Sequence, residues 1–590
     1  NAQTKENIIM KKTKIICTLG PASNNRETLK ALMENGMDIA RFNFSHGDHE
    51  EQKGRVDMIK ELREELDMPI AMLLDTKGPE IRTRLLKDGQ KVKLESGNQF
   101  VLGIGDFEGD DKKVAITYET LYKDVKPGNK ILIDDGLIEL EVKAIKGTDI
   151  ICDILNGGEL GEKKGVNVPY VKVNLPGITE QDKNDILFGI EQKFDFIAAS
   201  FVRSAEVIRE IRKLLNDNGG KDIGIIAKIE NAEGVENIDS IIEASDGIMV
   251  ARGDLGVEIP ASQVPHIQKE IIRKCNEHYT PVITATQMLD SMMKHPRPTR
   301  AEATDVANAV YDGTSAIMLS GETAAGDYPV EALQTMVKIA SRTEQDINYM
   351  SRLKKRGILT NPDITNAIAH ATCTTAMDLN ASAIITVSNS GRTARMVSKY
   401  RPACPIIGCS VNEDVCRKLN MSWGVTPLLV ELKHNSDELF DHAVDKAEEM
   451  GLIEQGEIVV LTAGVPLGIS GTTNMIKVHV AGHILMQGKG LTDKSAAANL
   501  CVISSPEELK EKFKEGDIIV ARDTSNEMME QIRLASGLII ENDSADCHGA
   551  IAGLSLDLPV LIGAENATQI LKSGAFVTLD GKKGIVSCNN

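Results

Sequence analysis

Two acidic side chains and a lysine stand where short apolar runs of the sequence end. Glu230 follows Lys228 by two residues in AKIEN, and Asp254 lies in ARGDLG. Alternation along a strand puts the side chains of Lys228 and Glu230 on one face. Paired carboxylates suit Mg²⁺, which keeps waters and substrate oxygens in its shell, and a lysine beside such a metal can stabilise a phosphoryl group in transfer. Spacing alone does not exclude two alternatives: the acids could be ordinary surface residues, and the lysine could form a structural salt bridge.

A second group of polar side chains follows the apolar runs that come earlier in the chain. Arg41 lies in ARFNFSHG and Arg82 in DTKGPEIR, where arginines can clamp phosphate oxygens bidentately. Oxygen-bearing side chains with one formal charge occur in the same segments: Asn43, Ser45, Asp75 and Thr76. This set suits a monovalent cation. His46 would contact a nucleotide phosphate or serve a structural role, and its position leaves both open.

A phosphate site is also predicted further along the chain, although no P-loop motif is present. The segment SNSGRT follows a predicted strand and opens a predicted helix, where backbone N–H groups bind phosphate. Its members are Ser388, Asn389, Ser390, Gly391, Arg392 and Thr393. A second glycine-rich loop, Ala463–Thr473, would cover the same ligand. A plain strand-to-helix turn is the alternative.

These side chains need a scaffold that brings the ends of many strands together. Eight apolar runs alternate with amphipathic stretches: Lys14–Leu19, Ile39–Phe44, Ile70–Leu74, Phe194–Ala199, Ile223–Ile229, Gly247–Ala251, Pro281–Ala285 and Ala316–Leu319. The rhythm is typical of βαβ units with strands buried on both faces. Each run ends in residues able to do chemistry, and in a (β/α)8 barrel such ends meet on one face. We therefore predict an α/β fold built on a TIM barrel.

The barrel pattern is interrupted between the third and fourth runs. Residues 79–176 show turn signals and period-two alternation, including a hairpin over Lys130–Ile145 around Asp134-Asp135-Gly136. We predict a small inserted β-barrel lid domain there, and a catalytic barrel over 10–78 and 177–342.

Two further α/β domains are predicted downstream. A helix over Thr365–Leu379 and the strands after it indicate a regulatory domain at 343–482. Small, polar residues predict a linker at 483–496, and 497–590 has strands of its own. Residues 1–9 precede a Met-Lys-Lys that resembles a natural start, so we interpret them as a processing remnant.

Composition excludes several classes of protein. The chain has 590 residues, 42% of them hydrophobic, and a formal net charge of −19. A negative field argues against general nucleic-acid binding, so anionic substrates need arginines and lysines gathered locally. No run is long or apolar enough to span a bilayer, and no signal peptide is evident, so we expect a cytoplasmic protein without membrane contact. The 10 cysteines lack a CxxC pair, which predicts reduced thiols.

Eight long segments together resemble the pyruvate kinase family. In the family's order, they are KIICTLGPAS, ARFNFSHG, DTKGPEIR, AKIENAEG, VARGDLGVEIP, ATQMLDSM, PRPTRAE and IMLSGETAAGDYP. The resemblance spans nearly all of Lys12–Pro329. It implies a barrel, a β lid and a regulatory domain. The implied activity is transfer of the phosphoryl group of phosphoenolpyruvate to ADP in glycolysis, dependent on Mg²⁺ (or Mn²⁺) and K⁺. It also implies allosteric control and a homotetramer.

Residue by residue, the resemblance implies roles for the polar strand ends. Arg41 and Lys228 would contact the transferring phosphoryl group. Thr286, with the backbone of Gly253 and Asp254, would bind the carboxylate, and Thr286 with a water relay would protonate the enolate. The implied Mg²⁺ ligands are Glu230 and Asp254, the K⁺ ligands Asn43, Ser45, Asp75 and Thr76, and the nucleotide contacts Asn43, His46 and Arg82. Glu80 matches the form linked to K⁺ dependence.

The sequence departs from the family pattern at two sites. Ser204 stands where many relatives have a second basic residue, which would weaken nucleotide or phosphate contacts. The loop Ala463–Thr473 lacks the Trp and Arg of the fructose-bisphosphate-sensing form, so AMP or a sugar monophosphate is the favoured effector of Ser388–Thr393.

The last unit resembles the swivelling phosphohistidine domain of phosphoenolpyruvate-utilising enzymes. The family's GGxTSHA reads SADCHGA here, at Ser544–Ala550. The carboxylate of Asp546 would disfavour a phosphoryl group on His548, so we predict a structural or regulatory domain. A phosphohistidine-relay enzyme and a catalytically dead sugar-phosphate sensor are the rival interpretations. The first would need an ATP-binding domain that we do not find, and the intact strand-end set argues against the second.

Overall fold

The chain forms a closed barrel of eight parallel strands in the order β1-β17-β16-β15-β14-β13-β3-β2. The computed structural model describes residues 11–356, 363–433, 435–454, 457–464, 473–482 and 484–588. The barrel strands are β1 (Lys14–Leu19), β2 (Ile39–Asn43), β3 (Ala71–Asp75), β13 (Phe196–Ala199), β14 (Gly224–Ile229), β15 (Gly247–Ala251), β16 (Val282–Ala285) and β17 (Ala316–Leu319). Each of the eight predicted runs overlaps one of them, so the TIM barrel is confirmed.

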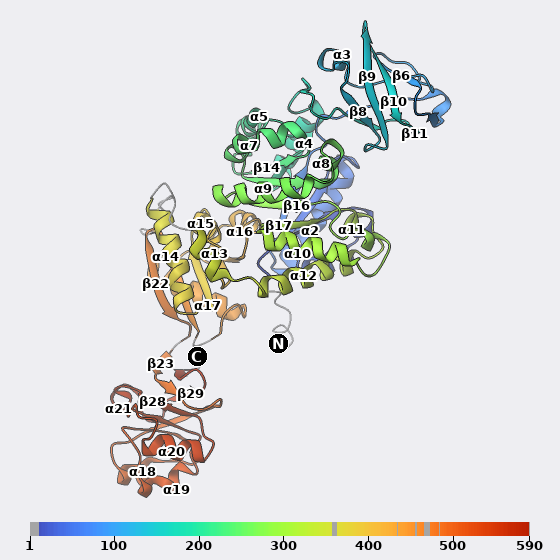
Figure 1. Ribbon diagram of the computed structural model, residues 1–590. Helices are drawn as coiled ribbons and strands as arrows, with labels where there is room; N and C mark the ends of the chain where they lie inside the picture. The colour runs from blue at the N-terminus through green and yellow to red at the C-terminus, as the bar shows by residue number, and fades with distance from the viewer. Residues whose placement is uncertain are drawn as a thin grey trace. The chain divides into compact units, whose positions relative to one another are not determined.

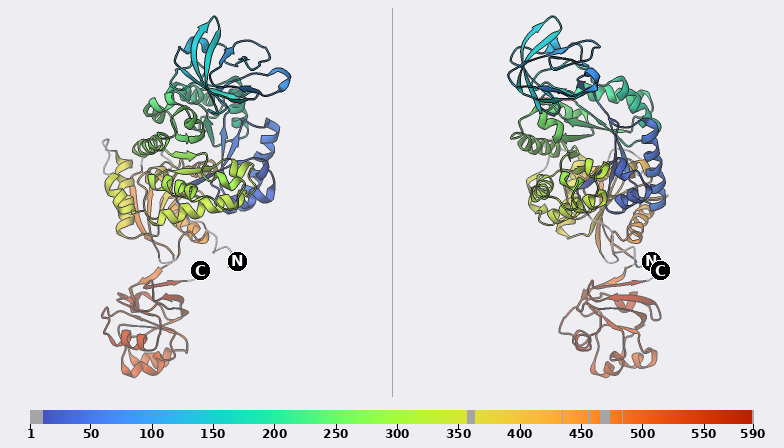
Figure 2. Two further views of the ribbon diagram at one scale, coloured as in Figure 1. Left: turned by 45° about the vertical axis from the view of Figure 1, so that its right-hand side comes forward. Right: turned by 90° about the vertical axis from the view of Figure 1, so that its right-hand side faces the viewer.

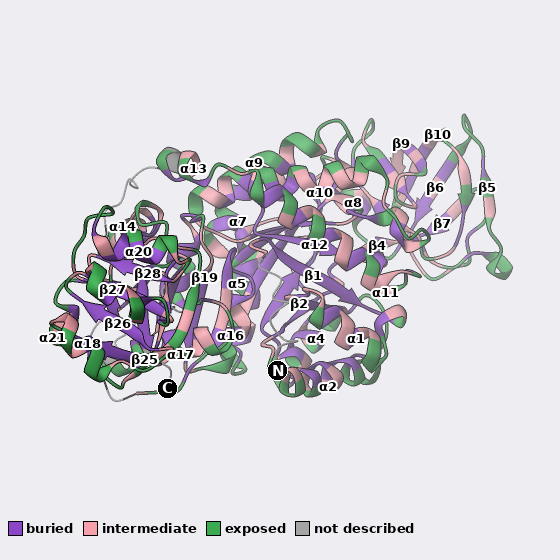
Figure 3. Ribbon diagram, turned by 90° about the horizontal axis from the view of Figure 1, so that it is seen from below, coloured by how far each residue is buried: buried purple, intermediate pink, exposed green. Residues whose placement is uncertain are grey.

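Burial explains why these segments are strands. All residues of β1, β3 and β15 are buried, which suits runs of Ile, Leu, Val and Ala without polar alternation. Figure 3 shows the barrel strands in the colour of buried residues. Ile16, Ile226 and Ile283 belong to one inner cluster, with side chains inside the barrel.

A ring of amphipathic helices covers the barrel (Figure 1). In α5 (Ala205–Asp217), Ala205, Ile208, Ile211 and Leu215 are buried, the spacing of one helical face. The other helices of this part are α1 (Arg26–Glu34), α2 (His49–Leu66), α4 (Glu180–Glu191), α6 (Ala232–Glu236), α7 (Ile238–Ala244), α8 (Arg252–Glu258), α9 (Val264–His278), α10 (Arg300–Asp312), α11 (Gly321–Ala324), α12 (Pro329–Gln345) and α13 (Tyr349–Arg356).

The predicted β insertion lies between β3 and α4 and has its own core, which includes Phe100, Leu102 and Leu140. Its main sheet has the order β4-β12-β8-β9-β10-β6-β7, and β5 pairs with β11. The elements are β4 (Ile81–Arg82), β5 (Val92–Leu94), β6 (Gln99–Gly103), β7 (Lys113–Ala115), α3 (Leu121–Asp124), β8 (Lys130–Ile133), β9 (Ile138–Lys146), β10 (Asp149–Asn156), β11 (Gly158–Leu160) and β12 (Gly165–Asn167). The predicted hairpin is the antiparallel pair β8–β9.

Residues 389–429 belong to the same compact unit as the barrel. They form α15 (Arg392–Ser398), β19 (Ile406–Ser410), α16 (Glu413–Leu419) and β20 (Val425–Leu429). Arg417 Nε donates to Asp195 Oδ1 at 3.0 Å, just before β13, and Arg401 Nη2 donates to Gly313 O at 3.0 Å, just before β17. These bonds attach the segment to the barrel end opposite the strand termini that carry the chemistry.

The second compact unit contains the rest of the described chain. Its first part holds α14 (Ile364–Asp378), β18 (Ala383–Val387), α17 (Ser436–Glu449), β21 (Ile458–Ala463) and β22 (Met475–Val480). β18 pairs parallel with β21, and β22 pairs antiparallel with β21. The helix predicted over Thr365–Leu379 and the strands predicted in this part are confirmed.

The C-terminal part, in orange to red in Figure 2, is built on an eight-stranded sheet in the order β23-β30-β29-β25-β26-β27-β28-β24. Its elements are β23 (Ile484–Gln487), β24 (Lys489–Gly490), β25 (Ser495–Val502), α18 (Pro506–Lys512), β26 (Ile518–Ala521), α19 (Met529–Ile532), β27 (Gly537–Ile540), α20 (His548–Ser555), β28 (Val560–Ile562), α21 (Ala567–Ile570), β29 (Phe576–Asp580) and β30 (Ile585–Cys588).

The prediction of a linker at 483–496 is wrong. Residues 484–490 form β23 and β24, and β25 begins at Ser495. β23 pairs with β30 and β24 with β28, strands that come much later in the chain. These pairings place the stretch in the sheet. The sequence held no local sign of them, because the stretch's small polar residues are typical of a linker and the partner strands are distant.

The structure also bears on the predictions about cysteines and membrane spans. The cysteines that the structure describes form no disulfide, and most of them are buried. Within the described part of the chain, every helix is too short or too polar to cross a bilayer. The predicted remnant at residues 1–9 lies outside the described residues.

Candidate active site

Lys228 lies near the C-terminal end of β14 with its ammonium group buried among polar partners. Its Nζ is 3.0 Å from Asp75 Oδ1 and 3.0 Å from Glu230 Oε1. It also donates to Ser200 Oγ at 2.8 Å. Burial by itself lowers the pKa of Lys228, but the charges of Asp75 and Glu230 outweigh burial and raise it. The amine is therefore a fixed positive charge rather than a proton acceptor.

Asp75, at the end of β3, connects the two cationic side chains of the site. It is 0% exposed, and its Oδ2 accepts a hydrogen bond from Arg41 Nε at 2.7 Å. Burial alone would raise the pKa of Asp75, yet Arg41 and Lys228 hold it below its usual range. Arg41 is further fixed by donating to Thr18 Oγ1 at 2.9 Å. Sequence reasoning expected Asp75 only as a K⁺ ligand and missed that it orients Arg41 and Lys228.

Ser200 is a second residue whose contribution the sequence reasoning missed. Its hydroxyl contacts Lys228 Nζ and donates to Asp75 Oδ1 at 3.1 Å, and its N–H donates to Thr76 Oγ1 at 3.1 Å. The signal available in the sequence was its position as the first polar residue after a barrel strand. Ser200 thus links the ends of β3, β13 and β14.

Glu230, directly after β14, and Asp254, in the first turn of α8 after β15, form a pair of carboxylates. Glu230 is 1% exposed and accepts a hydrogen bond from the Phe201 N–H at 2.6 Å. Burial raises the pKa of Glu230 to about 7; Lys228 opposes this rise and Asp254 adds to it. Burial also raises the pKa of Asp254. Two desolvated carboxylates facing one another fit a divalent cation, which would remove the electrostatic cost of holding both ionised.

The donor set is typical of Mg²⁺ rather than of a metal held in a protein cage. Among the described residues, no group of three or more His, Cys, Asp and Glu side chains could hold a metal ion. Mg²⁺ is commonly bound through one or two carboxylates, with waters and substrate phosphates completing its shell. Glu230 and Asp254 meet that requirement.

The turn after β16 presents the Thr286 hydroxyl to the first turn of α8. Thr286 has φ 68°, a left-handed conformation that is rare for a β-branched residue. Gly253 N–H donates to Thr286 Oγ1 at 2.7 Å. Arg252 holds this turn by donating to Thr286 O at 2.7 Å and to Asp305 Oδ1 at 2.8 Å. The structure therefore brings Thr286 and Gly253 into contact, and their binding of a carboxylate stays a prediction. Arg252 is a supporting residue that the sequence reasoning did not assign.

The four oxygen-bearing residues predicted for K⁺ come from the ends of β2 and β3. Asn43 is paired in register with Asp75. Asn43 Oδ1 accepts from the Ser45 N–H at 3.1 Å, and Thr76 is buried while Ser45 is exposed. The set is gathered at neighbouring strand ends, next to the Arg41–Asp75 pair.

The residues predicted to contact nucleotide lie on different parts of the unit. Arg82 belongs to β4 of the inserted domain rather than to the barrel rim, and its Nε donates to Glu80 Oε2 at 2.7 Å. His46 is exposed in the turn before α2. Ser204 is the N-cap residue of α5.

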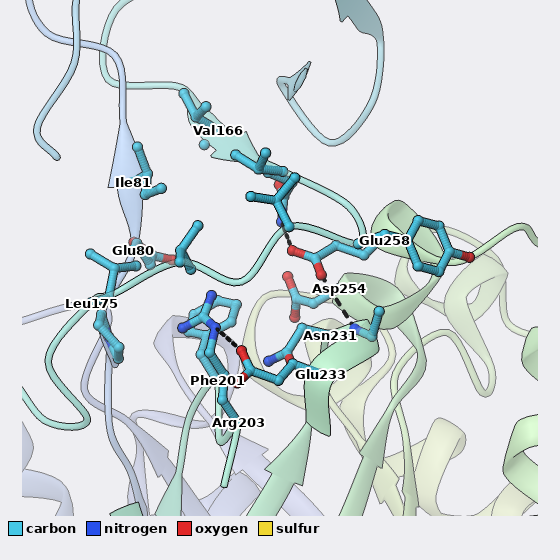
Figure 4. Close-up of a pocket in the computed structure, with 18 of the residues that line it drawn as sticks. Glu80, Ile81, Val166, Leu175, Phe201, Arg203, Asn231, Glu233, Asp254 and Glu258 are labelled. Atoms are coloured by element: carbon cyan, nitrogen blue, oxygen red, sulfur yellow. Dashed lines mark hydrogen bonds and ion pairs between the residues drawn. The ribbon is translucent and has the colours of Figure 1, made fainter. Parts of the chain in front are cut away.

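A cavity of about 500 Å³ lies between the barrel and the inserted domain, with Arg82 and Asp254 in its lining. Figure 4 shows Arg203, Glu233 and Glu258 around it. Arg203 Nε is 3.7 Å from Glu233 Oε2. Asn167 Nδ2, from β12, donates to Glu258 Oε1 at 3.2 Å. The volume is within the range of small-molecule sites, and the cavity reaches one of the two candidate Mg²⁺ ligands.

The predicted effector segment runs from the end of a strand into the first residues of a helix, as expected. Ser388 follows β18, and Gly391, with φ 69°, is the residue before α15. Thr393 is buried and Arg392 is exposed. Within the loop Ala463–Thr473, residues 465–472 lie outside the described residues.

His548 begins α20 in the C-terminal sheet domain and has both ring nitrogens in hydrogen bonds. Thr524 Oγ1 lies 2.7 Å from Nδ1, and Asn526 Oδ1 lies 3.0 Å from Nε2. If Asn526 Oδ1 accepts, Nε2 carries the proton and Nδ1 accepts from Thr524. Cys547, just before it, caps α20 by accepting from the Ala550 N–H.

The fold and the site together are typical of a barrel enzyme with its charged groups gathered at the strand ends. The strand ends present a permanently charged amine, an arginine held in place by a carboxylate, and a pair of acids that fits a divalent cation.

Comparison with known proteins identifies the family. Residues 10–333 match the family model "Pyruvate kinase, barrel domain", 366–479 match "Pyruvate kinase, alpha/beta domain", and 513–584 match "PEP-utilising enzyme, mobile domain". The chain is 51% identical to a pyruvate kinase of Bacillus licheniformis over 98% of this chain and 99% of that protein. It is 52% identical to a pyruvate kinase of Geobacillus stearothermophilus over 98% of each.

A solved structure of a pyruvate kinase is also similar to this chain. The crystal structure of a pyruvate kinase from Cryptosporidium parvum is similar with a TM-score of 0.78 and 40% identity, covering 80% of this chain and 97% of that one. The chain belongs to the pyruvate kinase family, as its motifs predicted, and is a phosphotransferase.

Proposed function

We propose that this chain transfers the phosphoryl group of phosphoenolpyruvate to ADP, giving pyruvate and ATP, in the glycolysis of the cytoplasm. The observation that carries the proposal is the buried Lys228 ammonium between Asp75 and Glu230. A transferring phosphoryl group spreads negative charge over its equatorial oxygens, so catalysis depends on fixed positive charge and positioning. Membership of the family supports the same reaction.

Arg41 and Lys228 would hold the phosphoryl group, with Asp75 fixing both cations. A terminal phosphate oxygen of ADP attacks phosphorus in line, and the bond from phosphorus to the enol oxygen breaks. Lys228 then faces the enolate that remains and stabilises its charge. Because the pKa of Lys228 is raised, the amine keeps its proton throughout.

Thr286 and the backbone of Gly253 and Asp254 would bind the carboxylate of the substrate. The Thr286 hydroxyl, through a water molecule, delivers a proton to the enolate carbon and completes pyruvate. The left-handed turn held by Arg252 supports this role, because it places the hydroxyl beside the Gly253 N–H.

Glu230 and Asp254 would hold Mg²⁺ or Mn²⁺, and Asn43, Ser45, Asp75 and Thr76 would hold K⁺. When bound, the divalent ion supplies Lewis-acid stabilisation of the charge on phosphoryl and enolate oxygens. Asn43, His46 and Arg82 would contact the phosphates of the nucleotide, with Arg82 brought to the cavity by the inserted lid.

Control would act through the regulatory domain at 343–482, with a phosphorylated effector at Ser388–Thr393. AMP and sugar monophosphates are the favoured classes, and the active form would be a homotetramer. The C-terminal domain would have a structural or regulatory role rather than transfer phosphoryl groups, because both ring nitrogens of His548 are engaged in hydrogen bonds and Asp546 adds a carboxylate two residues before it.

One assay tests the central claim: pyruvate formation from phosphoenolpyruvate and ADP by the purified chain, with and without Mg²⁺ and K⁺. Turnover that requires Mg²⁺ and rises with K⁺ supports the proposal. Absence of turnover under all ionic conditions, with sugar phosphates still bound, would support the sensor alternative. Transfer of radiolabel from phosphoenolpyruvate to His548 would support the relay alternative.

A further inference from the structure

The inserted domain is joined to the barrel by two chain connections of matching chemistry. The outgoing connection contains Gly78-Pro79 and the returning one Pro176-Gly177. In both, proline is on the side of the inserted domain and glycine on the side of the barrel. Proline fixes φ, so backbone freedom is concentrated at the glycines.

One buried carboxylate accepts from both connections. Asp182 is 1% exposed in the first turn of α4. Its Oδ1 accepts from the Gly78 N–H at 2.9 Å, and its Oδ2 accepts from the Thr179 N–H at 2.8 Å. The Asp182 N–H donates to Thr179 Oγ1 at 3.0 Å, a bond that caps α4 and does not involve the carboxylate. One carboxylate oxygen thus holds the outgoing connection at Gly78, and the other holds the end of the returning connection at Thr179.

The outgoing connection also packs directly on the site. Gly78 has φ 76°, and a Cβ there would lie 2.8 Å from Ser200 Cβ and 2.9 Å from a Phe201 ring carbon. Ser200 contacts Lys228, and the Phe201 N–H donates to Glu230. A displacement of Gly78 is therefore transmitted to the residues that position the charged groups of the site.

We propose that Asp182 is a positioning residue that fixes the pivot of the inserted lid relative to Lys228 and Glu230. It touches no reacting atom; it sets the point about which the lid turns, and so the distance between lid-borne Arg82 and the barrel rim. This inference rests on the proposed function, since it assumes that lid placement matters for turnover.

The test compares Asp182→Asn with Thr179→Ala in the full-length chain. Asn keeps the shape, but only one of its two terminal atoms can accept a hydrogen bond, so one connection is released. Thr179→Ala weakens the cap of the same helix and leaves both Asp182 oxygens free to accept, which makes it the matched control for helix stability.

For Asp182→Asn we expect kcat to fall about fivefold or more and the KM for ADP to rise. Faster amide exchange is expected in the peptides that contain Gly78 or Thr179. For Thr179→Ala we expect a lower melting temperature with kcat near wild type. Equal kcat in both variants, or unchanged exchange in Asp182→Asn, would overturn the proposal. Amide exchange is measured without substrates, so it tests whether Asp182 holds the two connections even if the wild-type chain fails to make pyruvate.

Discussion

Replacing Lys228 with Met tests the assignment of charge in the site most directly. The substitution keeps length and apolar volume but removes the ammonium that lies 3.0 Å from Asp75 and 3.0 Å from Glu230. Lys14→Met is the matched control: Lys14 is also a buried lysine on a barrel strand, and it begins β1 at the opposite end of the barrel.

The expected loss of activity is large and the expected loss of stability is moderate. A cation that stabilises a transferring phosphoryl group contributes about 10³-fold or more to turnover. Breaking a buried ion pair costs about 3–5 kcal/mol when a charge is left unpaired. Here Asp75 retains Arg41, and Glu230, whose pKa is already raised to about 7, can take up a proton. We therefore expect unfolding to become easier by only about 2 kcal/mol at pH 7.

Coupled measurement of pyruvate formation and urea unfolding of both variants provides the check. Lys228→Met should show no turnover above a thousandth of wild type while unfolding cooperatively, and Lys14→Met should retain kcat. Wild-type rates in Lys228→Met would refute the role of the amine. A variant that does not fold is replaced by Lys228→Gln, for which the same loss of turnover is expected.

Three further predictions concern other parts of the barrel unit. Burial lowers the pKa of Lys14 to about 8, so between pH 8 and about 10.5 the unfolded chain binds more protons and the folded state gains stability as pH rises. The difference in unfolding free energy between wild type and Lys14→Met should grow by up to about 3 kcal/mol across that window, and a flat difference would contradict the assignment. Gly78→Ala should lower kcat and the melting temperature, because the new Cβ would lie 2.8 Å from Ser200 Cβ. Gly89→Ala is the control, because Gly89 also has a left-handed φ, of 66°, but no atom within 4 Å of the new Cβ, so only backbone strain is added. Equal effects of the two would show that packing on Ser200 is unimportant. Removal of divalent cations with EDTA should weaken phosphoenolpyruvate binding by at least about tenfold in equilibrium dialysis, and unchanged binding would exclude a metal role for Glu230 and Asp254.

The barrel could be predicted from the sequence because its signal is local. Each strand is a short apolar run buried on both faces, and polar residues follow it directly, as at Thr286 after β16. Strand ends in a barrel must converge, so Lys228, Glu230 and Asp254 could be placed together before any coordinates.

What the sequence could not supply were pairings between distant segments. The strands β23 and β24 look like linker because their partners β30 and β28 come much later in the chain. Similarly, Thr179 and Asp182 form a local capping box, but nothing near Asp182 indicates that its other oxygen accepts from Gly78, which is separated from it by the whole inserted domain. Ser200 and Arg252 were visible as polar strand ends, but their partners were not.

The charge balance of the site explains why metal dependence should be strict. Arg41 and Lys228 are opposed by three acids, Asp75, Glu230 and Asp254, so the unliganded site carries a net negative charge when all are ionised. Such a site repels a substrate that bears both a carboxylate and a phosphate. A divalent cation at Glu230 and Asp254 would make the net charge of the site positive, and a monovalent cation beside Asp75 would add to that positive charge. We therefore expect the acids that orient Lys228 to make the site depend on added cations, so that the affinity for phosphoenolpyruvate follows the occupancy of the metal site rather than the charge of Lys228 alone.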